Sequence, residues 1–373
     1  MNQSYKQIPY IEQLKLKQNH VLSVFSESHI KHPVNKIIKN DQEKHYRHKV
    51  TASATTVFID KRPKLRLGMF IENTHDIDPG FSSFIHDKKI NELLQTIEKV
   101  LNQYKISAYD IKKRQGILKH VLIRKSFLNK DMLLVFVTHG NLFPNAKHIV
   151  NDIRKEHESL KTAIQMIQNK QTPIVLYGEE KIIYGPGYIE DGFDGLSFRL
   201  SAKSFYQVNP EQMIKLYEYA INQANISNKD VVMDCYSGIG TISLLAAKKA
   251  KEVIGVEINQ SAVKDAIINA KQNHIQNVKF YNEDVENYIE QFHGKIDVLM
   301  LDPARAGATL KFLNAVKKLK PKRIVYISCY VETQVRDLKS LLHMYEIKDI
   351  QPVDMFSFTE HIENIVLLDL KEK

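Results

Sequence analysis

The second half of the chain alternates between two patterns of apolar residues. Short apolar runs rich in β-branched residues are separated by stretches whose apolar positions recur every three or four residues, which is typical of strands that alternate with helices. This order predicts an α/β domain with a parallel, Rossmann-like sheet. The expected strands are 231–236, 252–258, 278–281, 297–301 and 323–328, and helices are expected at 241–250 and 260–273.

The chain ends with two apolar runs, 347–353 and 361–370, that are separated by a short loop. A parallel crossover needs about a dozen residues or more. The two runs are therefore expected to form an antiparallel hairpin at the end of the sheet, and we place this α/β domain at residues 204–373.

The first half has a less regular α+β pattern, which predicts a smaller, separate domain at residues 41–203. Residues 8–40 have a mostly helical pattern, and we expect the segment 1–40 to pack on the α/β domain. The elements expected in the smaller domain are strands 49–60 and 64–71 with a turn around Lys61-Arg-Pro63, a helix at 89–104, strands 118–124 and 132–138, and one long helix from 146 to 169.

Charge is distributed unevenly along the 373 residues, whose net charge is +10. Residues 1–200 hold 31 Lys and Arg against 21 Asp and Glu, whereas residues 201–373 hold 22 of each. A polyanion such as nucleic acid is the natural partner of the basic half. A lysine-rich solvated surface would give the same charge, so charge alone does not establish this partner.

Composition excludes several classes of protein. No stretch approaches the roughly 20 apolar residues of a membrane span, and the polar N-terminus does not resemble a secretory signal. Cys235 and Cys329 are too few for a disulfide framework, a four-cysteine zinc site or a cysteine-bound iron–sulfur cluster. We therefore expect a cytoplasmic protein that binds neither metal nor membrane.

The turns after the first three strands hold candidate cofactor contacts. Asp234-Cys-Tyr-Ser-Gly238-Ile-Gly240 joins a strand to a helix, and its glycines permit close backbone approach to a ligand. Glu257 ends the next strand and could accept both ribose hydroxyls of an adenosine, while Asp284 could accept an adenine amino group. Two glycines alone are more often a tight turn, but together with these carboxylates they favour an adenosine-type cofactor.

The next two strands end in residues suited to group transfer. Asp302-Pro-Ala-Arg-Ala-Gly307 is either an ordinary turn or a loop that faces cofactor and substrate. Most free cysteines are buried apolar residues, as we expect for Cys235. Cys329 instead follows the fifth strand, where a helix N-terminus and the nearby cation Arg336 predict a lowered thiol pKa.

Two further segments bear on the chemistry. Glu363 interrupts the last apolar run, so it is either an edge-strand charge or a base with a raised pKa. Ser204-Phe-Tyr-Gln-Val-Asn-Pro210 is either a linker or a segment whose aromatic rings stack on a nucleobase and whose amides bond to it. Neither segment is specific by itself.

In this order, the motifs resemble those of the RNA uridine-C5 methyltransferases, which use S-adenosylmethionine to methylate ribosomal and transfer RNA. The resemblance extends over nearly the whole chain. Residues 204–210 resemble the family's Phe-Gln-Val-Asn motif, 234–240 its cofactor loop, 302–307 its Asp-Pro-Pro-Arg motif, Ser328-Cys329 its nucleophile motif, and 354–356 with 361–363 its closing motif.

The resemblance implies a Rossmann-like class I methyltransferase domain, S-adenosylmethionine as cofactor, and roles for the matching residues. Cys329 would be the nucleophile that forms a covalent adduct with uracil, and Glu363 would be the base. Phe205, Asp302 and Arg305 would contact the target nucleotide. The implied cofactor contacts are Gln207, Tyr236, Gly238, Glu257, Asp284 and Asp302.

The chain also departs from the family pattern. Tyr330-Val331 follows Cys329 where members usually have Asn-Pro, and Ala304 replaces the second proline of Asp-Pro-Pro-Arg. The N-terminal RNA-binding β-barrel and the iron–sulfur cysteines of many members are absent, so no iron–sulfur cluster is expected. These departures leave open a relative that binds RNA but has lost turnover.

The expected partner is RNA, bound by a monomer. The stretch 354–368 resembles ribosomal members more closely, which favours a uridine in 23S ribosomal RNA, with transfer RNA as the alternative. A methyltransferase that acts on an amine is disfavoured, because such enzymes need no cysteine and usually have an aromatic residue at the position of Arg305.

Overall fold

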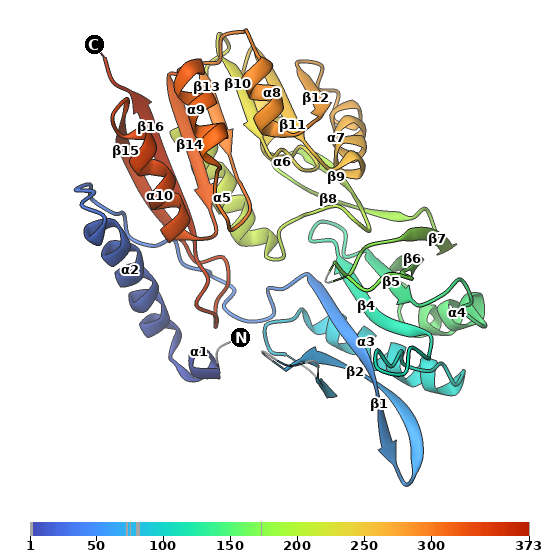
Figure 1. Cartoon of the computed structure of the whole chain (residues 1–373). Helices are drawn as coiled ribbons and strands as arrows, with labels where there is room; N and C mark the ends of the chain where they lie inside the picture. The colour runs from blue at the N-terminus through green and yellow to red at the C-terminus, as the bar shows by residue number, and fades with distance from the viewer. Residues whose placement is uncertain (1–2, 72–73, 75, 80–82, 173, 373) are drawn as a thin grey trace. The chain divides into compact units, whose positions relative to one another are not determined.

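The computed structural model describes residues 3–71, 74, 76–79, 83–172 and 174–372 (Figure 1). The chain divides into two compact units. Unit 1 consists of Met1–Glu43, Asp194–Phe198 and Ser204–Lys373, and unit 2 consists of Lys44–Phe193 and Arg199–Lys203. Each unit has its own large sheet and its own apolar core.

Unit 1 is built on a seven-stranded sheet with the order β12-β11-β10-β13-β14-β16-β15. Strands β10 to β14 are parallel, and β16 runs antiparallel between β14 and β15. This arrangement confirms the predicted parallel sheet with a terminal hairpin. The strands are β10 (Val231–Cys235), β11 (Glu252–Glu257), β12 (Val278–Asn282), β13 (Val298–Leu301), β14 (Arg323–Ser328), β15 (Tyr345–Val353) and β16 (Glu363–Leu370).

Side-chain caps determine where several helices of unit 1 begin. Asn209, Asn259, Asp284 and Thr309 precede α5, α7, α8 and α9, and each accepts a hydrogen bond from the backbone of the first turn. Helices α2, α10, α9 and α8 are successive neighbours (Figure 1). The helices are α1 (Gln3–Gln7), α2 (Tyr10–Glu27), α5 (Pro210–Gln223), α6 (Thr241–Ala247), α7 (Gln260–Gln272), α8 (Val285–Gln291), α9 (Leu310–Leu319) and α10 (Val331–Leu341).

The N-terminal segment belongs to the core of unit 1. Val21 and Phe25 of α2 are buried in the same apolar cluster as residues of β13 and β14. The helical prediction for residues 8–40 holds only as far as the end of α2. His29 has a positive φ of 58°, and Pro33 cannot donate to a helical ladder. The chain then runs alongside β15, where Ile38 forms a parallel bridge with Val353.

Unit 2 contains a seven-stranded sheet with the order β3-β2-β1-β4-β5-β6-β7, in which only β5 and β6 are parallel neighbours. Ile90, Leu93 and Ile97 of α3 are fully buried at the spacing of one helix face. The elements are β1 (Lys49–Ile59), β2 (Arg62–Phe70), β3 (Ile77–Pro79), α3 (Lys88–Gln103), β4 (Leu118–Lys125), β5 (Met132–Thr138), α4 (Ala146–Glu156), β6 (Leu160–Ile167) and β7 (Glu179–Tyr184). A separate two-stranded sheet consists of β8 (Tyr188–Phe193) and β9 (Leu196–Ser201), and the boundary of the units falls within β9.

In the first half, the predicted hairpin is confirmed with a shifted turn, whereas the predicted long helix is wrong. The long helix 146–169 is α4 followed by strand β6, in which every residue except Lys161 is buried because the strand lies inside the sheet. Burial does not alternate along β6, where Thr162 and Gln165 are buried together with their apolar neighbours, so the strand lacks the period that would distinguish it from a helix. The first hairpin turns at Asp60-Lys61, both with positive φ, so Arg62 and Pro63 belong to β2. Strands β7, β8, β9 and helix α5 have no counterpart among the predicted elements.

Candidate active site

The predicted site loops lie at one edge of the unit 1 sheet. Parallel strands end on the same side, so β10 to β14 carry Tyr236, Glu257, Asp284, Asp302 and Cys329 to that edge. Strand order reverses at β10, whose neighbours are β11 and β13. Ligands of open α/β sheets bind at such a switch point.

The glycine loop after β10 leaves an open space beside Glu257. Tyr236, Gly238 and Gly240 have positive φ values of 67°, 55° and 84°. The Gly238 N–H donates to Glu257 Oε2 at 3.0 Å, and the Asn259 N–H donates to Oε1 at 2.7 Å. A Cβ on Gly238 would meet no described atom within 4 Å. The loop therefore has room for a ligand next to this carboxylate.

Asp284 and Ser237 offer polar atoms to such a ligand. Asp284 Oδ1 accepts hydrogen bonds from the N–H groups of Glu286 at 2.9 Å and Asn287 at 3.3 Å, while Oδ2 accepts none from the described residues. Ser237 Oγ is buried and also has no partner within the described ranges. The open loop and these available atoms fit the predicted adenosine-type cofactor.

Three carboxyl groups lie at the same edge, of which Asp234 and Glu363 are buried and Asp302 is half-buried. Burial raises the pKa of Asp234 and of Asp302 to about 7. Glu363 is 3% exposed, and burial, followed by the charge of Asp302, raises its pKa well above the usual value. Glu363 Oε2 has no hydrogen-bond partner in the described part of the chain. The interpretation of Glu363 as an edge-strand charge is wrong, because β16 lies inside the sheet.

Cys329 lies next to Glu363. Antiparallel pairing aligns Ser328 of β14 with Asn364 of β16, so Cys329 and Glu363 are the next facing positions. Burial and the charges of Glu363 and Asp302 raise the pKa of the Cys329 thiol to about 11, although Arg305 opposes this effect. The prediction of a lowered thiol pKa is therefore wrong, because burial of the thiol and the neighbouring carboxylates outweigh the cation.

Arg336, the cation expected near the thiol, holds a loop instead. Its Nη2 donates to the carbonyls of Ala306 at 2.8 Å and Ala308 at 3.2 Å, and it pairs with Asp337 Oδ1 at 2.7 Å. Asp337 Oδ2 accepts from the Ala308 N–H at 2.7 Å. Both ends of this pair thus fix the loop that follows Asp302.

The raised pKa predicts slow alkylation of Cys329 at neutral pH. Because the thiolate is the reacting species, the rate with iodoacetamide should rise about tenfold per pH unit between about pH 7 and about pH 10. Cys235 is fully buried and is an internal control that should stay unmodified. Mass spectrometry of the two cysteine peptides measures both rates. A rate at Cys329 that is already constant above neutral pH would contradict the raised pKa.

Aromatic and cationic side chains lie on the accessible side of the site. Arg305 Nη2 is 2.8 Å from His361 Nδ1, and the guanidinium is 5.8 Å from the centre of the Tyr330 ring. Tyr330 is 41% exposed, and Phe205 in the segment before α5 is 62% exposed. Exposed rings of this kind are suited to stacking on a nucleobase.

Tyr217 of α5 is a site residue that the sequence analysis missed. Its buried phenol has a pKa raised by burial and by the three carboxyl groups described above, and the Gln207 side chain is hydrogen-bonded to it. Tyr217 therefore connects the carboxyl groups to a predicted cofactor contact. A signal for the helix that carries it was present, since Asn209-Pro210 combines a capping side chain with proline in the first turn.

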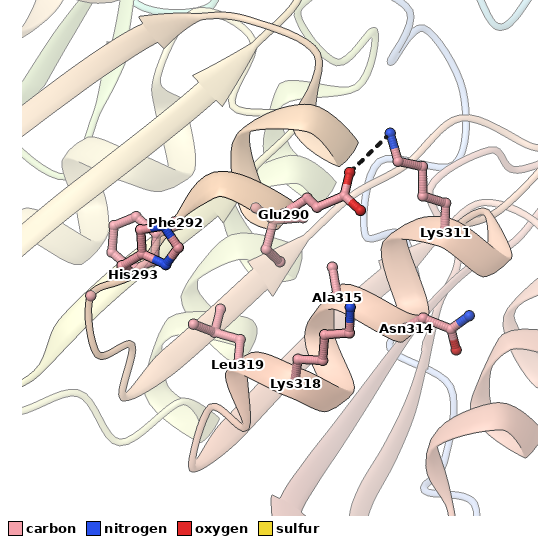
Figure 2. Close-up of a pocket in the computed structure, with 10 residues that line it drawn as sticks. Glu290, Phe292, His293, Lys311, Asn314, Ala315, Lys318 and Leu319 are labelled. Carbon is pink, nitrogen blue, oxygen red and sulfur yellow. Dashed lines mark ion pairs between the residues drawn. The ribbon is translucent and has the colours of Figure 1, made fainter.

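A pocket of about 560 Å³ lies away from this edge (Figure 2). It is lined by the end of α8, the residues that follow it, and one side of α9, where Lys311 pairs with Glu290 at 3.3 Å. A helix that follows a parallel strand runs back to the opposite edge of the sheet. The pocket includes none of the predicted site residues, so it is not part of this site.

The described residues form neither a membrane-spanning helix nor a cluster of metal ligands. No helix there is both long enough and apolar enough to cross a membrane. No group of three or more His, Cys, Asp or Glu residues there is arranged to hold a metal ion.

Several known proteins resemble this chain in fold or in sequence. The crystal structure of Pyrococcus abyssi tRNA (uracil-54, C5)-methyltransferase in complex with S-adenosyl-L-homocysteine matches with a TM-score of 0.81 at 22% identity, over 97% of this chain and 84% of that one. An uncharacterized RNA methyltransferase of Oceanobacillus iheyensis is 37% identical over 97% of this chain and 80% of its own length. A second, from Staphylococcus epidermidis, is 36% identical over 98% of this chain and 80% of its own length.

A sequence model of one family matches almost the entire chain, from residue 9 to residue 371. Its description is tRNA (uracil-5-)-methyltransferase. The match includes every residue of the site described above. The chain therefore belongs to the tRNA (uracil-5-)-methyltransferase family of RNA methyltransferases.

Proposed function

We propose that this protein transfers a methyl group from S-adenosylmethionine to carbon 5 of a uridine in RNA through a covalent bond between Cys329 and the uracil. The observation that carries the proposal is the placement of a half-buried thiol beside Glu363, a buried carboxyl whose Oε2 has no partner among the described residues. A methyltransferase that acts on a nucleophilic amine needs neither group. Methylation of an unactivated pyrimidine carbon needs both.

The chemistry assigns a separate task to each group. Cys329 Sγ, as a thiolate, adds to carbon 6 of the uracil, and the ring electrons move to carbon 5 as an enolate. S-adenosylmethionine, when bound, supplies the methyl group that carbon 5 takes. Glu363 then removes the proton from carbon 5, and the electron pair of that bond expels the Cys329 sulfur. Burial favours this role, because a carboxylate with a raised pKa is a stronger base.

Cofactor binding is assigned to the open glycine loop and its neighbours. Glu257 would bind the ribose hydroxyls, and Asp284 would accept from the adenine amino group through Oδ2. Gly238 would face the ligand where its missing side chain leaves space. Gln207, Tyr236 and Asp302 would complete the contacts around the methionine part and the switch point.

A pair of matched alanine substitutions tests this loop. Gly238 and Gly240 both have positive φ, so replacing either with alanine costs about 1–2 kcal/mol of conformational strain. A Cβ on Gly240 would also lie 2.7 Å from Phe280 Cζ, so Gly240→Ala should lower the free energy of unfolding by about 2–4 kcal/mol in total. Gly238→Ala should lower the free energy of unfolding by only the conformational strain of about 1–2 kcal/mol. The added methyl group should, however, weaken binding of S-adenosylhomocysteine about tenfold or more.

Calorimetric titration and denaturant unfolding measure the two quantities. Equal affinity of the wild type and Gly238→Ala for S-adenosylhomocysteine would contradict the assignment of the loop.

RNA binding is assigned to the basic first half and to the exposed rings beside the site. Phosphates would pair with Lys and Arg of residues 1–200, which carry all the excess positive charge. Phe205 would stack on the target nucleotide, and Arg305 with Asp302 would bond to it. We propose 23S ribosomal RNA as the substrate, because the stretch 354–368 resembles ribosomal members. The Pyrococcus protein, in contrast, acts on transfer RNA.

Two assays test the proposed function. Incubation with labelled S-adenosylmethionine and either ribosomal or transfer RNA should give labelled 5-methyluridine, and the RNA that is labelled identifies the substrate. RNA that contains 5-fluorouridine should form a gel-stable adduct with the protein, because fluorine cannot leave as a proton. Labelling of any other nucleoside would refute the reaction. RNA binding without product and without adduct would identify a relative that has lost turnover.

A further inference from the structure

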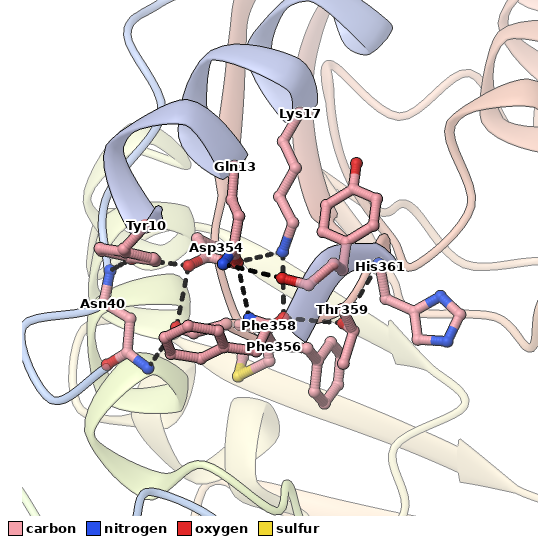
Figure 3. Close-up of polar contacts among 12 residues, drawn as sticks. Tyr10, Gln13, Lys17, Asn40, Asp354, Phe356, Phe358, Thr359 and His361 are labelled. Atoms are coloured by element: carbon pink, nitrogen blue, oxygen red, sulfur yellow. Dashed lines mark hydrogen bonds and ion pairs between the residues drawn. The ribbon is translucent and has the colours of Figure 1, made fainter. Parts of the chain in front are cut away.

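The loop that leads into Glu363 is held by polar contacts from α2. We call residues 354–362, between β15 and β16, the closing loop. Lys17 Nζ donates to Asp354 Oδ1 at 2.6 Å and to the Phe356 carbonyl at 3.0 Å (Figure 3). The side chains of Lys17 and Asp354 are 1% and 0% exposed. A complete ion pair thus lies inside unit 1, between segments more than three hundred residues apart in sequence.

The second oxygen of Asp354 is bound as well. Tyr10 OH donates to Asp354 Oδ2 at 2.6 Å, and the Asn40 N–H donates to Tyr10 OH at 2.7 Å. Ser357 Oγ also donates to Asp354 Oδ2, at 3.0 Å. Both oxygens of Asp354 therefore accept hydrogen bonds, which fixes the orientation of the carboxylate.

The backbone of the closing loop is held from two helices. From α2, Gln13 Oε1 accepts from the Phe358 N–H at 2.8 Å. At the start of α5, the capping residue Asn209 donates through Nδ2 to the Met355 carbonyl at 3.0 Å, and Gln212 Nε2 donates to the Asp354 carbonyl at 2.9 Å. Asn209 belongs to the same segment as Gln207, and Gln212 lies in the first turn of the helix that follows it. The closing loop is thus bound between the N-terminal helix and the helix next to the cofactor contacts.

The loop ends in the residues that face the substrate. His361, which bonds to Arg305, and Glu363 follow the Lys17-bound Phe356 within seven positions. Removing an ammonium and a carboxylate from water costs free energy, and apolar residues often replace a buried pair without loss of stability. A buried pair gives directional contacts that an apolar pair does not. What this pair determines is the path of the loop.

We propose that Lys17 is a positioning residue for the methylation reaction, which holds Asp354 and Phe356 so that Glu363 faces the carbon atom above Cys329. The inference rests on the proposed function of Glu363 as the base. It assigns to the N-terminal helix a part in the second half of the reaction, the proton removal that releases the adduct, and none in formation of the adduct.

The test compares Lys17→Met with Lys15→Met. Lys15 lies on the same helix but is 63% exposed, and its one ion pair among the described residues is with Glu12, so its loss should change nothing. Lys17→Met should slow product release about 10- to 100-fold, because a displacement near 1 Å of a reacting group costs up to about 10²-fold. Formation of the adduct with 5-fluorouridine RNA should stay within about threefold of the wild type. Adduct on ordinary RNA should therefore accumulate.

A purely structural role predicts a different result. If Lys17→Met lowers only the unfolding temperature, or slows adduct formation and release equally, the inference is wrong. The double variant Lys17→Met/Asp354→Asn removes both charges and should recover part of the release rate.

If Lys17→Met does not fold, Tyr10→Phe keeps both charges and removes one bond to Asp354. It should still slow release more than adduct formation, and unchanged release would overturn the inference. Wild-type protein that gives neither product nor adduct would instead refute the proposed function.

Discussion

Replacing Cys329 with alanine is expected to abolish formation of 5-methyluridine, with a fall in turnover of at least about 10⁴-fold. Without the sulfur, carbon 5 of the uracil has no enolate electrons with which to take a methyl group. The 5-fluorouridine adduct should disappear as well. S-adenosylhomocysteine binding should be unchanged within about twofold, because the cofactor loop is formed by other strands. Labelled nucleoside analysis and a denaturing gel measure the two losses.

Cys235→Ala is the matched control. This variant makes the same chemical change, loss of a thiol, at a fully buried position in β10. Formation of the adduct and of the product should be unchanged. The cost should be confined to stability, at about 1 kcal/mol for the small cavity. Full activity of Cys329→Ala would remove the basis of the covalent mechanism, whereas loss of activity in both variants would point to a general defect of the sheet.

Replacing Glu363 with glutamine is expected to stop the reaction after methyl transfer. Glutamine has nearly the same shape but cannot remove the proton from carbon 5, so the methylated adduct should accumulate even on ordinary RNA. Release of product should fall about 10²- to 10⁴-fold, the range of general base catalysis. Adduct formation itself should persist. A denaturing gel with labelled RNA follows the adduct, and nuclease digestion of the released RNA follows the product.

The control for this variant is Glu360→Gln. Glu360 lies in the closing loop but is exposed, so the same substitution should leave release unaltered. Release by Glu363→Gln at the wild-type rate would assign the base to another group.

Glu363→Gln should also change how the free energy of unfolding depends on pH. The folded pKa of Glu363 is raised above its unfolded value, so the folded protein binds the extra proton. The contribution of this carboxyl to the free energy of unfolding of the wild type is therefore fully present below about pH 4, and it is lost as the pH rises toward the folded pKa. Glu363→Gln should lack this decline. Denaturant unfolding of both proteins between about pH 5 and about pH 9 measures the difference.

Much of unit 1 could be predicted because its signals are local. A βαβ order of apolar runs forms a parallel sheet, and the turns after its strands must meet at one edge. The glycine loop, Glu257, Asp302 and Cys329 were placed there for this reason. In unit 2 the same method failed at β6, because a strand buried on both sides has no regular alternation of apolar and polar positions to mark its period.

The electrostatics of the site could not be predicted from neighbours in sequence. Arg336 lies close to Cys329 along the chain, yet it bonds to the carbonyls of a different loop. The thiol pKa is raised first by burial and then by Glu363 and Asp302, which come from β16 and the end of β13. Tyr217 reaches the same carboxyl groups from α5.

The sequence by itself determined the family, the parallel sheet, and the kinds of side chain at its carboxyl edge, because periodicity, turn chemistry and motif order are written in consecutive residues. Only the tertiary structure decided the pKa values of those side chains and which distant segments contact the loops that carry them. Burial and charge depend on groups that meet in space, and Lys17 meets Asp354 only once the N-terminal helix lies on the closing loop.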